Sequence, residues 1–151
     1  MMLNDDYKEM LSILSEEKVK YLVIGAFALG TYGYPRATGD IDIWVEASID
    51  NSNKVFKSLA RFGAPTDNIE AKDFEKKGII FQIGIAPRRI DITTVIDGVD
   101  FEQAYPKRKI VNIEGINIPI ISCEDLILNK ESTGREKDLL DVKMLKQKNK
   151  L

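Results

Sequence analysis

Two aspartates separated by a single isoleucine are the residues of this 151-residue chain that point most directly to chemistry. Asp40 and Asp42 lie in a segment of alternating acidic and apolar residues, and in a β-strand residues i and i+2 project from the same face. Asp91 has the same apolar flanks later in the chain. If the two strands are neighbours, three carboxylates converge on one patch, where their repulsion is unfavourable unless cations neutralise it. The pattern therefore predicts a site for Mg²⁺, which prefers hard oxygen ligands and commonly bridges to phosphates.

A place for such a phosphate is predicted at Gly25. The apolar run Tyr21 to Ile24 ends at this glycine and is followed by a helical pattern, which indicates a buried strand, a tight turn and a helix start. A helix N-terminus offers free N–H groups and the positive end of the helix dipole to an anion.

The composition removes most other catalytic chemistries. The chain has no histidine, which excludes imidazole-based nucleophiles, bases and zinc sites, and Cys123 is its only cysteine. Lys and Arg total 22 against 24 Asp and Glu, so the net charge of −2 provides no strong field for nucleic acid or an anionic membrane. Any catalysis must rest on carboxylates, Lys, Arg, hydroxyls or a metal bound by oxygen.

The elements that must position these residues follow from periodicity and from glycine and proline punctuation. Pro119 favours an edge position for its strand, and Ser122 caps the helix that follows it. The mixed order predicts an α/β or α+β fold with a partly antiparallel sheet flanked by helices, in one domain over residues 1–151. Its core covers about 20–125 and its C-terminal helices about 122–148. We expect helices over 5–17, 26–32, 55–62, 122–133 and 135–148, and strands over 21–24, 40–45, 79–83, 89–95, 109–113 and 116–121.

The glycine turn and the three aspartates resemble those of the nucleotidyltransferase superfamily, whose fold is that of DNA polymerase beta. The superfamily pattern is a glycine followed by Gly or Ser at a helix start, then Asp-x-Asp about a dozen residues later, then a third acidic residue in a later strand. Gly25, Asp40, Asp42 and Asp91 fall on those positions. The resemblance covers most of residues 20 to 145. The segment 25–42 is similar, more narrowly, to small bacterial members related to abortive-infection type IV toxins.

The end of the chain adds to this resemblance. Members of that group carry a lysine and an Arg-x-x-Asp-like cluster there, and Lys130, Arg135, Asp138 and Asp141 are similar. One departure is Ala26, where the superfamily usually has Gly or Ser. The missing hydroxyl predicts a weaker hold on phosphate, although backbone N–H groups can still bind it.

The resemblance implies a nucleotidyltransferase (EC 2.7.7 type) that moves a nucleoside monophosphate from an NTP to an acceptor hydroxyl and releases pyrophosphate. Asp40 and Asp42 would hold two Mg²⁺ ions, or Mn²⁺ in their place, across the α-phosphate. Asp91 would be a ligand on the acceptor side and would accept the hydroxyl proton.

The same resemblance implies the contacts of the nucleotide. Gly25 and Ala26 would bind phosphate at the turn. Arg36 and Thr38, in the loop before the first aspartate, would contact the triphosphate, and Lys130 would offset its charge.

Structural interpretations of the same residues stay open. The three aspartates could line a solvated strand face. Arg36 could pair with Asp40 or Asp42 and relieve repulsion without any metal. The cluster around Lys130 could be a set of ion pairs on a helix surface. The aromatic residues Tyr32, Tyr34 and Trp44 favour packing over base stacking.

The acceptor is left open by the sequence. A toxin–antitoxin role would make it a tRNA end or a partner protein, an antibiotic-modifying role would make it a small molecule, and a degenerate nucleotide-binding module would have kept the carboxylates without turnover. Apolar residues cover more than one side of the last helix, which predicts a homodimer or a partner chain. Neither the polar N-terminus nor the apolar run 21–29 resembles a signal peptide or a membrane span, so we expect a cytoplasmic protein without membrane contact.

Overall fold

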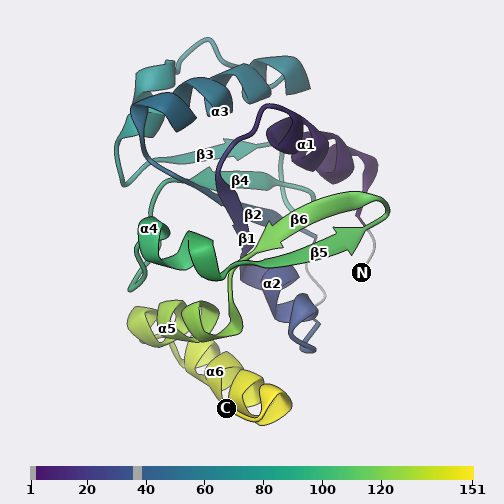
Figure 1. The fold of residues 1–151 in the computed structure, drawn as a ribbon, viewed down its shortest axis with the longest axis vertical. Helices are drawn as coiled ribbons and strands as arrows, with labels where there is room; N and C mark the ends of the chain where they lie inside the picture. Colours follow the sequence, from purple (N-terminus) through teal and green to yellow (C-terminus); the bar gives the residue numbers. More distant parts are fainter. Residues whose placement is uncertain (1–2, 36–38) are drawn as a thin grey trace.

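The computed structural model describes residues 3–35 and 39–151 of the chain (Figure 1). Arg36 and Thr38 lie outside the described residues. The helical elements are α1 (Asp5–Glu16), α2 (Gly25–Thr31), α3 (Ile49–Phe62), η1 (Ala71–Glu75), α4 (Phe101–Ala104), η2 (Tyr105–Lys107), α5 (Cys123–Thr133) and α6 (Glu136–Asn149). The strands are β1 (Tyr21–Ile24), β2 (Ile41–Val45), β3 (Ile80–Ile83), β4 (Ile90–Thr93), β5 (Lys109–Ile113) and β6 (Ile116–Ile120).

The described strands form one six-stranded sheet in the order β3-β4-β2-β1-β6-β5. β2 is antiparallel to β1 and parallel to β4, and this parallel register places Asp42 directly opposite Asp91. The sheet is therefore mixed and flanked by helices, as the sequence predicts. The two strands that carry the predicted site are neighbours.

One face of the sheet is an apolar core beneath α1. The Tyr21 hydroxyl is 3.0 Å from the hydroxyl of Ser15 in α1, so Tyr21 points to that side. Because Tyr21 lies opposite Val45, Val45 is on this face, and so are Ile43 and Ile41, two and four residues before it. All of these residues are buried. Figure 1 shows α1 and α3 at one end of the view and α5 and α6 at the other, with the strands between.

The other face of the sheet carries the polar site. Asp42 and Trp44 alternate with the core residues of β2, so they point away from α1. Trp44 is buried and packs edge-on against Phe101 of α4, with the ring centroids 5.0 Å apart. Packing rather than base stacking is therefore the role of this tryptophan, as predicted.

Two details differ from the sequence predictions. Pro119 lies in β6, which is flanked by β1 and β5 and is not an edge strand. Ile121 donates its N–H to the Val23 carbonyl of β1, and Pro119, two residues earlier, therefore has the position of its absent N–H on the β1 side as well. β1 and β6 share a single registered pair there, Val23 and Ile120. The third helix begins at Ile49 rather than at residue 55, because Ser48 caps it by accepting from the Asn51 N–H. The short turns η1, α4 and η2 are not predicted by periodicity.

The two C-terminal helices pack against each other. Ser122 caps α5 by accepting from the Asp125 N–H at 3.1 Å, and Gly134 ends it in the left-handed conformation. The side chain of Asn149, at the end of α6, donates to the Tyr32 carbonyl just past α2. Among the described residues no helix is both long enough and apolar enough to cross a membrane.

Candidate active site

A cleft of about 230 Å³ brings the predicted carboxylates together with the C-terminal helices. We call it the carboxylate cleft. Its strand wall consists of Asp40, Asp42, Arg89 and Asp91, and its helix wall of Lys130, Lys137 and Asp138. Ala26 and Leu29 of α2 close the remaining side.

Gly25 is required where α2 meets the strand wall. It has φ +67°, a conformation that residues with a Cβ rarely adopt. A Cβ at this position would also collide with the Oδ2 atom of Asp42. The glycine therefore lets the backbone of α2 lie against a carboxylate of the site. A turn glycine could be predicted from the sequence, but this contact could not.

The loop that carries Asp40 is fixed from three directions. The Tyr7 hydroxyl of α1 hydrogen-bonds the Gly39 carbonyl and lies 3.3 Å from the Arg89 carbonyl. A Cβ on Gly39 would collide with the carbonyl oxygen of Pro87, so only glycine permits this approach. The Arg89 N–H donates to Asp40 Oδ1 at 2.9 Å. Tyr7 is therefore a positioning residue that the sequence analysis missed.

Arg89 is the counter-ion of the strand wall. Its Nε donates to Asp91 Oδ1 at 2.6 Å and its Nη2 to Asp91 Oδ2 at 3.0 Å, a bidentate pair. The same Nη2 is 3.7 Å from Asp40 Oδ2. The predicted relief of repulsion by Arg36 falls outside the described residues, and within them Arg89 has this role. Arg89 lies two residues before Asp91, so in a strand the two side chains share a face, and this spacing could have predicted their ion pair.

Asp42 is the carboxylate that Arg89 compensates least. Burial, the charges of Asp91 and Asp40 and a hydrogen bond with Asp91 raise the pKa of Asp42 from 3.8 to about 6, and the more distant charge of Arg89 only opposes this. The strand wall therefore carries negative charge that the described residues do not neutralise.

Lys130 and Asp138 of the helix wall form a buried cluster with Asp141, rather than a set of surface ion pairs. Lys130 is 8% exposed, and its Nζ lies 3.0 Å from Asp141 Oδ2 and 3.4 Å from Asp138 Oδ1. Burial acts to raise the pKa of Asp138, but a hydrogen bond from Thr133, the charge of Lys130 and a hydrogen bond from Arg135 together lower it. The interpretation of this cluster as a solvated helix surface is therefore wrong for its lysine and aspartates, whereas the Arg135 side chain is 75% exposed.

The donor atoms of the strand wall suit a hard cation, because they are carboxylate oxygens without sulfur or imidazole. In this conformation no group of three or more Asp, Glu, His or Cys side chains within residues 3–35 and 39–151 is arranged to hold a metal ion. Arg89 occupies both oxygens of Asp91. A cation that contacts all three aspartates would therefore share the Asp91 oxygens with Arg89 or displace its side chain.

Most of the predicted site residues are brought together by the fold. Of the catalytic and nucleotide-binding candidates, Asp40, Asp42, Asp91, Ala26 and Lys130 line the cleft, and Gly25 contacts it through Asp42. Arg36 and Thr38 lie outside the described residues.

The cleft also contains a cation that the sequence analysis did not single out. Lys137 is exposed and, among the described cations of the cleft, is the one without an acidic partner. A lone lysine in a charged helix gives no sequence signal for such a role.

Comparisons with solved structures show what this architecture is similar to. A candidate nucleotidyltransferase from Thermotoga maritima is 16% identical, with a TM-score of 0.64, over 95% of this chain and 94% of that one. The lincosamide antibiotic adenylyltransferase LnuA, in its lincomycin-bound form, is 21% identical with a TM-score of 0.58, over 96% and 97%. ANT(2")-Ia, in complex with adenylyl-2"-tobramycin, is 12% identical with a TM-score of 0.60, over 93% and 86%. At these identities the likeness establishes the shared fold.

A search of curated proteins finds no match. The family described as "nucleotidyltransferase of unknown function (DUF6036)" matches residues 1–150. Because this match spans nearly the whole chain, the protein belongs to that nucleotidyltransferase family.

Proposed function

We propose that this protein transfers a nucleoside monophosphate from an NTP to an acceptor hydroxyl, with pyrophosphate as the leaving group. The observation that carries the proposal is the convergence on one cleft beside Gly25 of Asp42 and Asp91, from neighbouring strands, and of Asp40, which lies just before β2. This excess of negative charge opposes the binding of a triphosphate unless cations come with it, so it supports a site for a metal-bound nucleotide.

The aspartates have distinct roles in this proposal. Asp40 and Asp42 bind divalent cations, which would supply charge neutralisation at the α-phosphate and align the attacking and leaving oxygens. Asp91 orients the acceptor hydroxyl and accepts its proton on a carboxylate oxygen. Each of its oxygens accepts one hydrogen bond from Arg89 in the present conformation and keeps a lone pair for the proton.

The helix wall faces the triphosphate in this proposal. Lys130 keeps its place through Asp138 and Asp141, and contributes a fixed positive charge near the phosphates. Lys137 is exposed at the same cleft, and its flexible side chain reaches the phosphates. Arg36 and Thr38, which precede Asp40 in the sequence, contact the triphosphate as well.

For the acceptor, a small molecule is the class we favour. Two of the proteins with the same fold are antibiotic adenylyltransferases, LnuA and ANT(2")-Ia. This chain covers 97% and 86% of their lengths, so it has room for a similarly small acceptor site. A toxin–antitoxin role, with a tRNA end or a protein as acceptor, stays a prediction of the sequence resemblance.

Thermal unfolding with each of the four NTPs, with and without Mg²⁺, tests the nucleotide site. A ligand at about 100 times its dissociation constant stabilises the folded state by about 2.7 kcal/mol. We expect a rise in the unfolding midpoint that needs Mg²⁺ and is lost in Asp40→Asn. Asp67→Asn, an exposed aspartate outside the cleft, is the matched control and should behave as the wild type.

Transfer itself is tested with an α-labelled NTP and candidate acceptors such as lincomycin and tobramycin. Label should reach an acceptor in the wild type and in Asp67→Asn, and Asp42→Asn should lower the rate by about 100-fold or more. Equal labelling by the wild type and Asp42→Asn would contradict the proposed roles. Nucleotide binding without transfer to any acceptor would favour the degenerate module.

Association through α6 stays a prediction. Leu139 and Leu140 on this helix are 47% and 56% exposed, whereas Val142 and Leu145 are buried within the chain. A dimer or a partner protein would cover the two exposed leucines. Light scattering at high concentration measures this, and a monomer with no co-purifying protein would count against it.

A further inference from the structure

The sheet has a free edge at β5 (Figure 1). β5 is the last strand in the order of the sheet, and no strand within residues 3–35 and 39–151 pairs with its outer side. Ile110 of this strand is 52% exposed, and Asn112 is exposed as well. Proline and β-bulges keep many edge strands from pairing with other chains, but β5 has no proline and pairs one to one with β6 along its whole length. β5 can therefore accept a further strand.

The backbone of β5 presents hydrogen-bonding groups to this edge at two residues, Ile110 and Asn112. The two-residue turn that follows β5 has positive φ at both positions, so the flanking residues Ile113 and Ile116 form a hydrogen-bonded pair. In an antiparallel ladder such pairs alternate with pairs that share no hydrogen bond. The N–H and C=O groups of Ile110 and Asn112 therefore point away from β6.

A groove of about 570 Å³ follows the outer side of β5. All residues of β5 line it, together with Glu114 and with Gly30 and Thr31 of α2. No residue of β6 lines the groove, so it borders the free edge of the strand rather than a face of the sheet. The groove leaves room for an extended segment beside β5.

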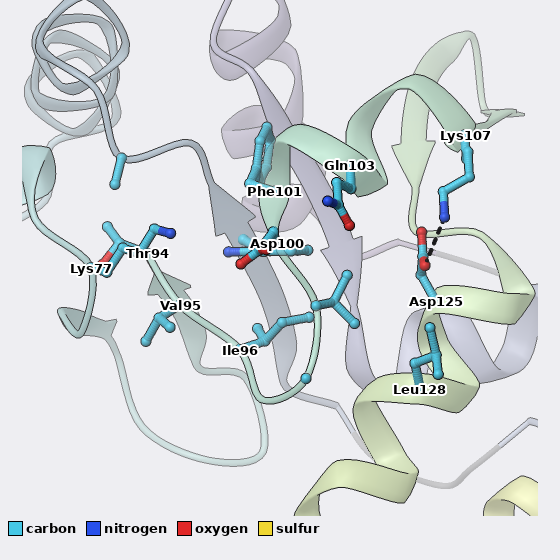
Figure 2. Close-up of a pocket in the computed structure, with 14 residues that line it drawn as sticks. Lys77, Thr94, Val95, Ile96, Asp100, Phe101, Gln103, Lys107, Asp125 and Leu128 are labelled. Atoms are coloured by element: carbon cyan, nitrogen blue, oxygen red, sulfur yellow. Dashed lines mark hydrogen bonds and ion pairs between the residues drawn. The ribbon is translucent and has the colours of Figure 1, made fainter.

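The charges at the two ends of β5 have opposite signs. Arg108 precedes the strand and Glu114 follows it. The neighbouring Lys107 pairs with Asp125 (Figure 2), whereas Arg108 has no acidic partner among the described residues. Glu114 pairs with Lys8 at 2.9 Å, but its side chain is still 40% exposed. A strand with opposite charges at its ends is complementary to an antiparallel copy of itself.

We propose that β5 pairs with β5 of a second copy of this chain, antiparallel and around a two-fold axis at Val111. In this register Ile110 lies opposite Asn112 of the second copy, so the outward groups of the two strands meet. Arg108 then lies opposite Glu114 of the second copy, and symmetry repeats this pair. Registers centred on Ile110 or on Asn112 also join the outward groups, but they do not bring Arg108 and Glu114 together.

The opposite edge strand, β3, is less suited to pair with its own copy. The nearest charged residue on either side of β3 is basic, Lys77 before the strand and Arg88 after it. An antiparallel pair of two β3 strands would bring these like charges towards each other. Charge therefore favours β5.

Light scattering of the nucleotide-free protein at about 100 μM measures the association. We expect twice the 17.1 kDa mass of one chain. Arg108→Glu and Glu114→Arg each place like charges opposite each other, so each should raise the dissociation constant of the dimer at least about tenfold. The double variant restores opposite charges and should recover the wild-type constant. A monomeric wild type, or a folded double variant that associates as weakly as the single variants, would overturn the proposal.

Cysteine cross-linking tests the register in a Cys123→Ser background. Val111→Cys places two thiols opposite each other in a pair without mutual hydrogen bonds, where the Cα atoms are about 4.5 Å apart and within reach of a disulfide. Ile110→Cys is the matched control, because Ile110 is more exposed than Val111 but lies more than about 7 Å from its own copy. Oxidised glutathione should therefore link Val111→Cys into a covalent dimer at least about tenfold faster than Ile110→Cys. Equal rates, or the reverse order, would overturn the proposal.

A substitution on α6 separates this interface from the association predicted for that helix. Leu140 is 56% exposed, and Leu140→Ser should leave the mass of the dimer unchanged. Loss of the dimer in Leu140→Ser, while Arg108→Glu and Glu114→Arg stay dimeric, would assign the association to α6 and overturn the proposal. None of these measurements uses a nucleotide, so their outcome is independent of the proposed catalytic function.

Discussion

The strand wall and the helix wall of the carboxylate cleft treat negative charge in opposite ways. In the described part of the strand wall, three aspartates share one cation, Arg89, and the pKa of Asp42 rises to about 6 because of burial and its acidic neighbours. Part of the negative charge is left uncompensated there, and an added cation would relieve the repulsion between the carboxylates.

In the helix wall the buried carboxylates lie beside a cation. Asp138 and Asp141 share Lys130, and despite burial the hydrogen bonds and charges around Asp138 lower its pKa. The cluster is also buried, so its charges interact strongly and are costly to separate. The acidic residues of one cleft therefore differ in how their charge is compensated: those of the strand wall keep excess negative charge around one arginine, and those of the helix wall hold a lysine in place.

The largest expected effect is on the helix wall. Lys130→Met removes the cation that two buried carboxylates share, and breaking such a cluster typically costs about 3–5 kcal/mol of unfolding free energy. Urea denaturation measures this. Lys137→Met, at an exposed lysine of the same cleft, is the matched control and should change stability by less than about 0.5 kcal/mol. Equal effects of the two substitutions would remove the distinction between the walls.

On the strand wall a substitution should stabilise the metal-free protein. The folded state raises the pKa of Asp42 from 3.8 to about 6, so it binds the proton more tightly than the unfolded state and loses stability as the pH rises through that window. Above it, ionised Asp42 costs up to about 3 kcal/mol. Asp42→Asn should therefore raise stability at about pH 8 and have little effect below about pH 4. A gain of the same size at both pH values would contradict this origin.

Arg89 should compete with a cation for the strand wall. Arg89→Gln frees both oxygens of Asp91, so we expect a lower unfolding midpoint without metal and about tenfold tighter binding of Mg²⁺. Unfolding over a range of Mg²⁺ concentrations measures both. The exposed neighbour Arg88, changed to Gln, is the control and should leave both quantities unchanged. Unaltered Mg²⁺ affinity in Arg89→Gln would mean that the arginine does not occupy the cation's place.

The smallest effect is expected at the rim of the helix wall. The Arg135 side chain is 75% exposed although its Nε is 2.9 Å from Asp138 Oδ2. Solvent screens such a pair, and Thr133 and Lys130 still contact the same carboxylate, so Arg135→Gln should cost less than about 1 kcal/mol. A loss comparable to that of Lys130→Met, in the same urea assay, would show that the cluster depends on its exposed member.

The local sequence pattern was sufficient to predict most of the helices and strands. Alternation placed Asp42 correctly on its strand, but β2 begins at Ile41, so Asp40 lies just before the strand and not within it. Glycine and serine punctuation located the ends of some helices, such as Ser122 and Gly134 for α5. Short turns such as α4 and the early start of α3 escaped prediction, because capping and packing decide them rather than periodicity. The edge position expected from Pro119 was wrong, since a proline is tolerated wherever its absent N–H faces a short ladder.

The chemical groups available to the site can be read from the sequence alone: carboxylates, lysines and arginines without imidazole, in an order that belongs to nucleotidyltransferases. How their charges pair depends on contacts in the folded chain. The parallel register of β2 and β4 sets Asp42 against Asp91, and the packing of α5 on α6 buries Lys130 between two aspartates. Coulomb interactions and desolvation depend on distance and burial, which arise from contacts between residues far apart in the chain, and local sequence pattern does not specify those contacts.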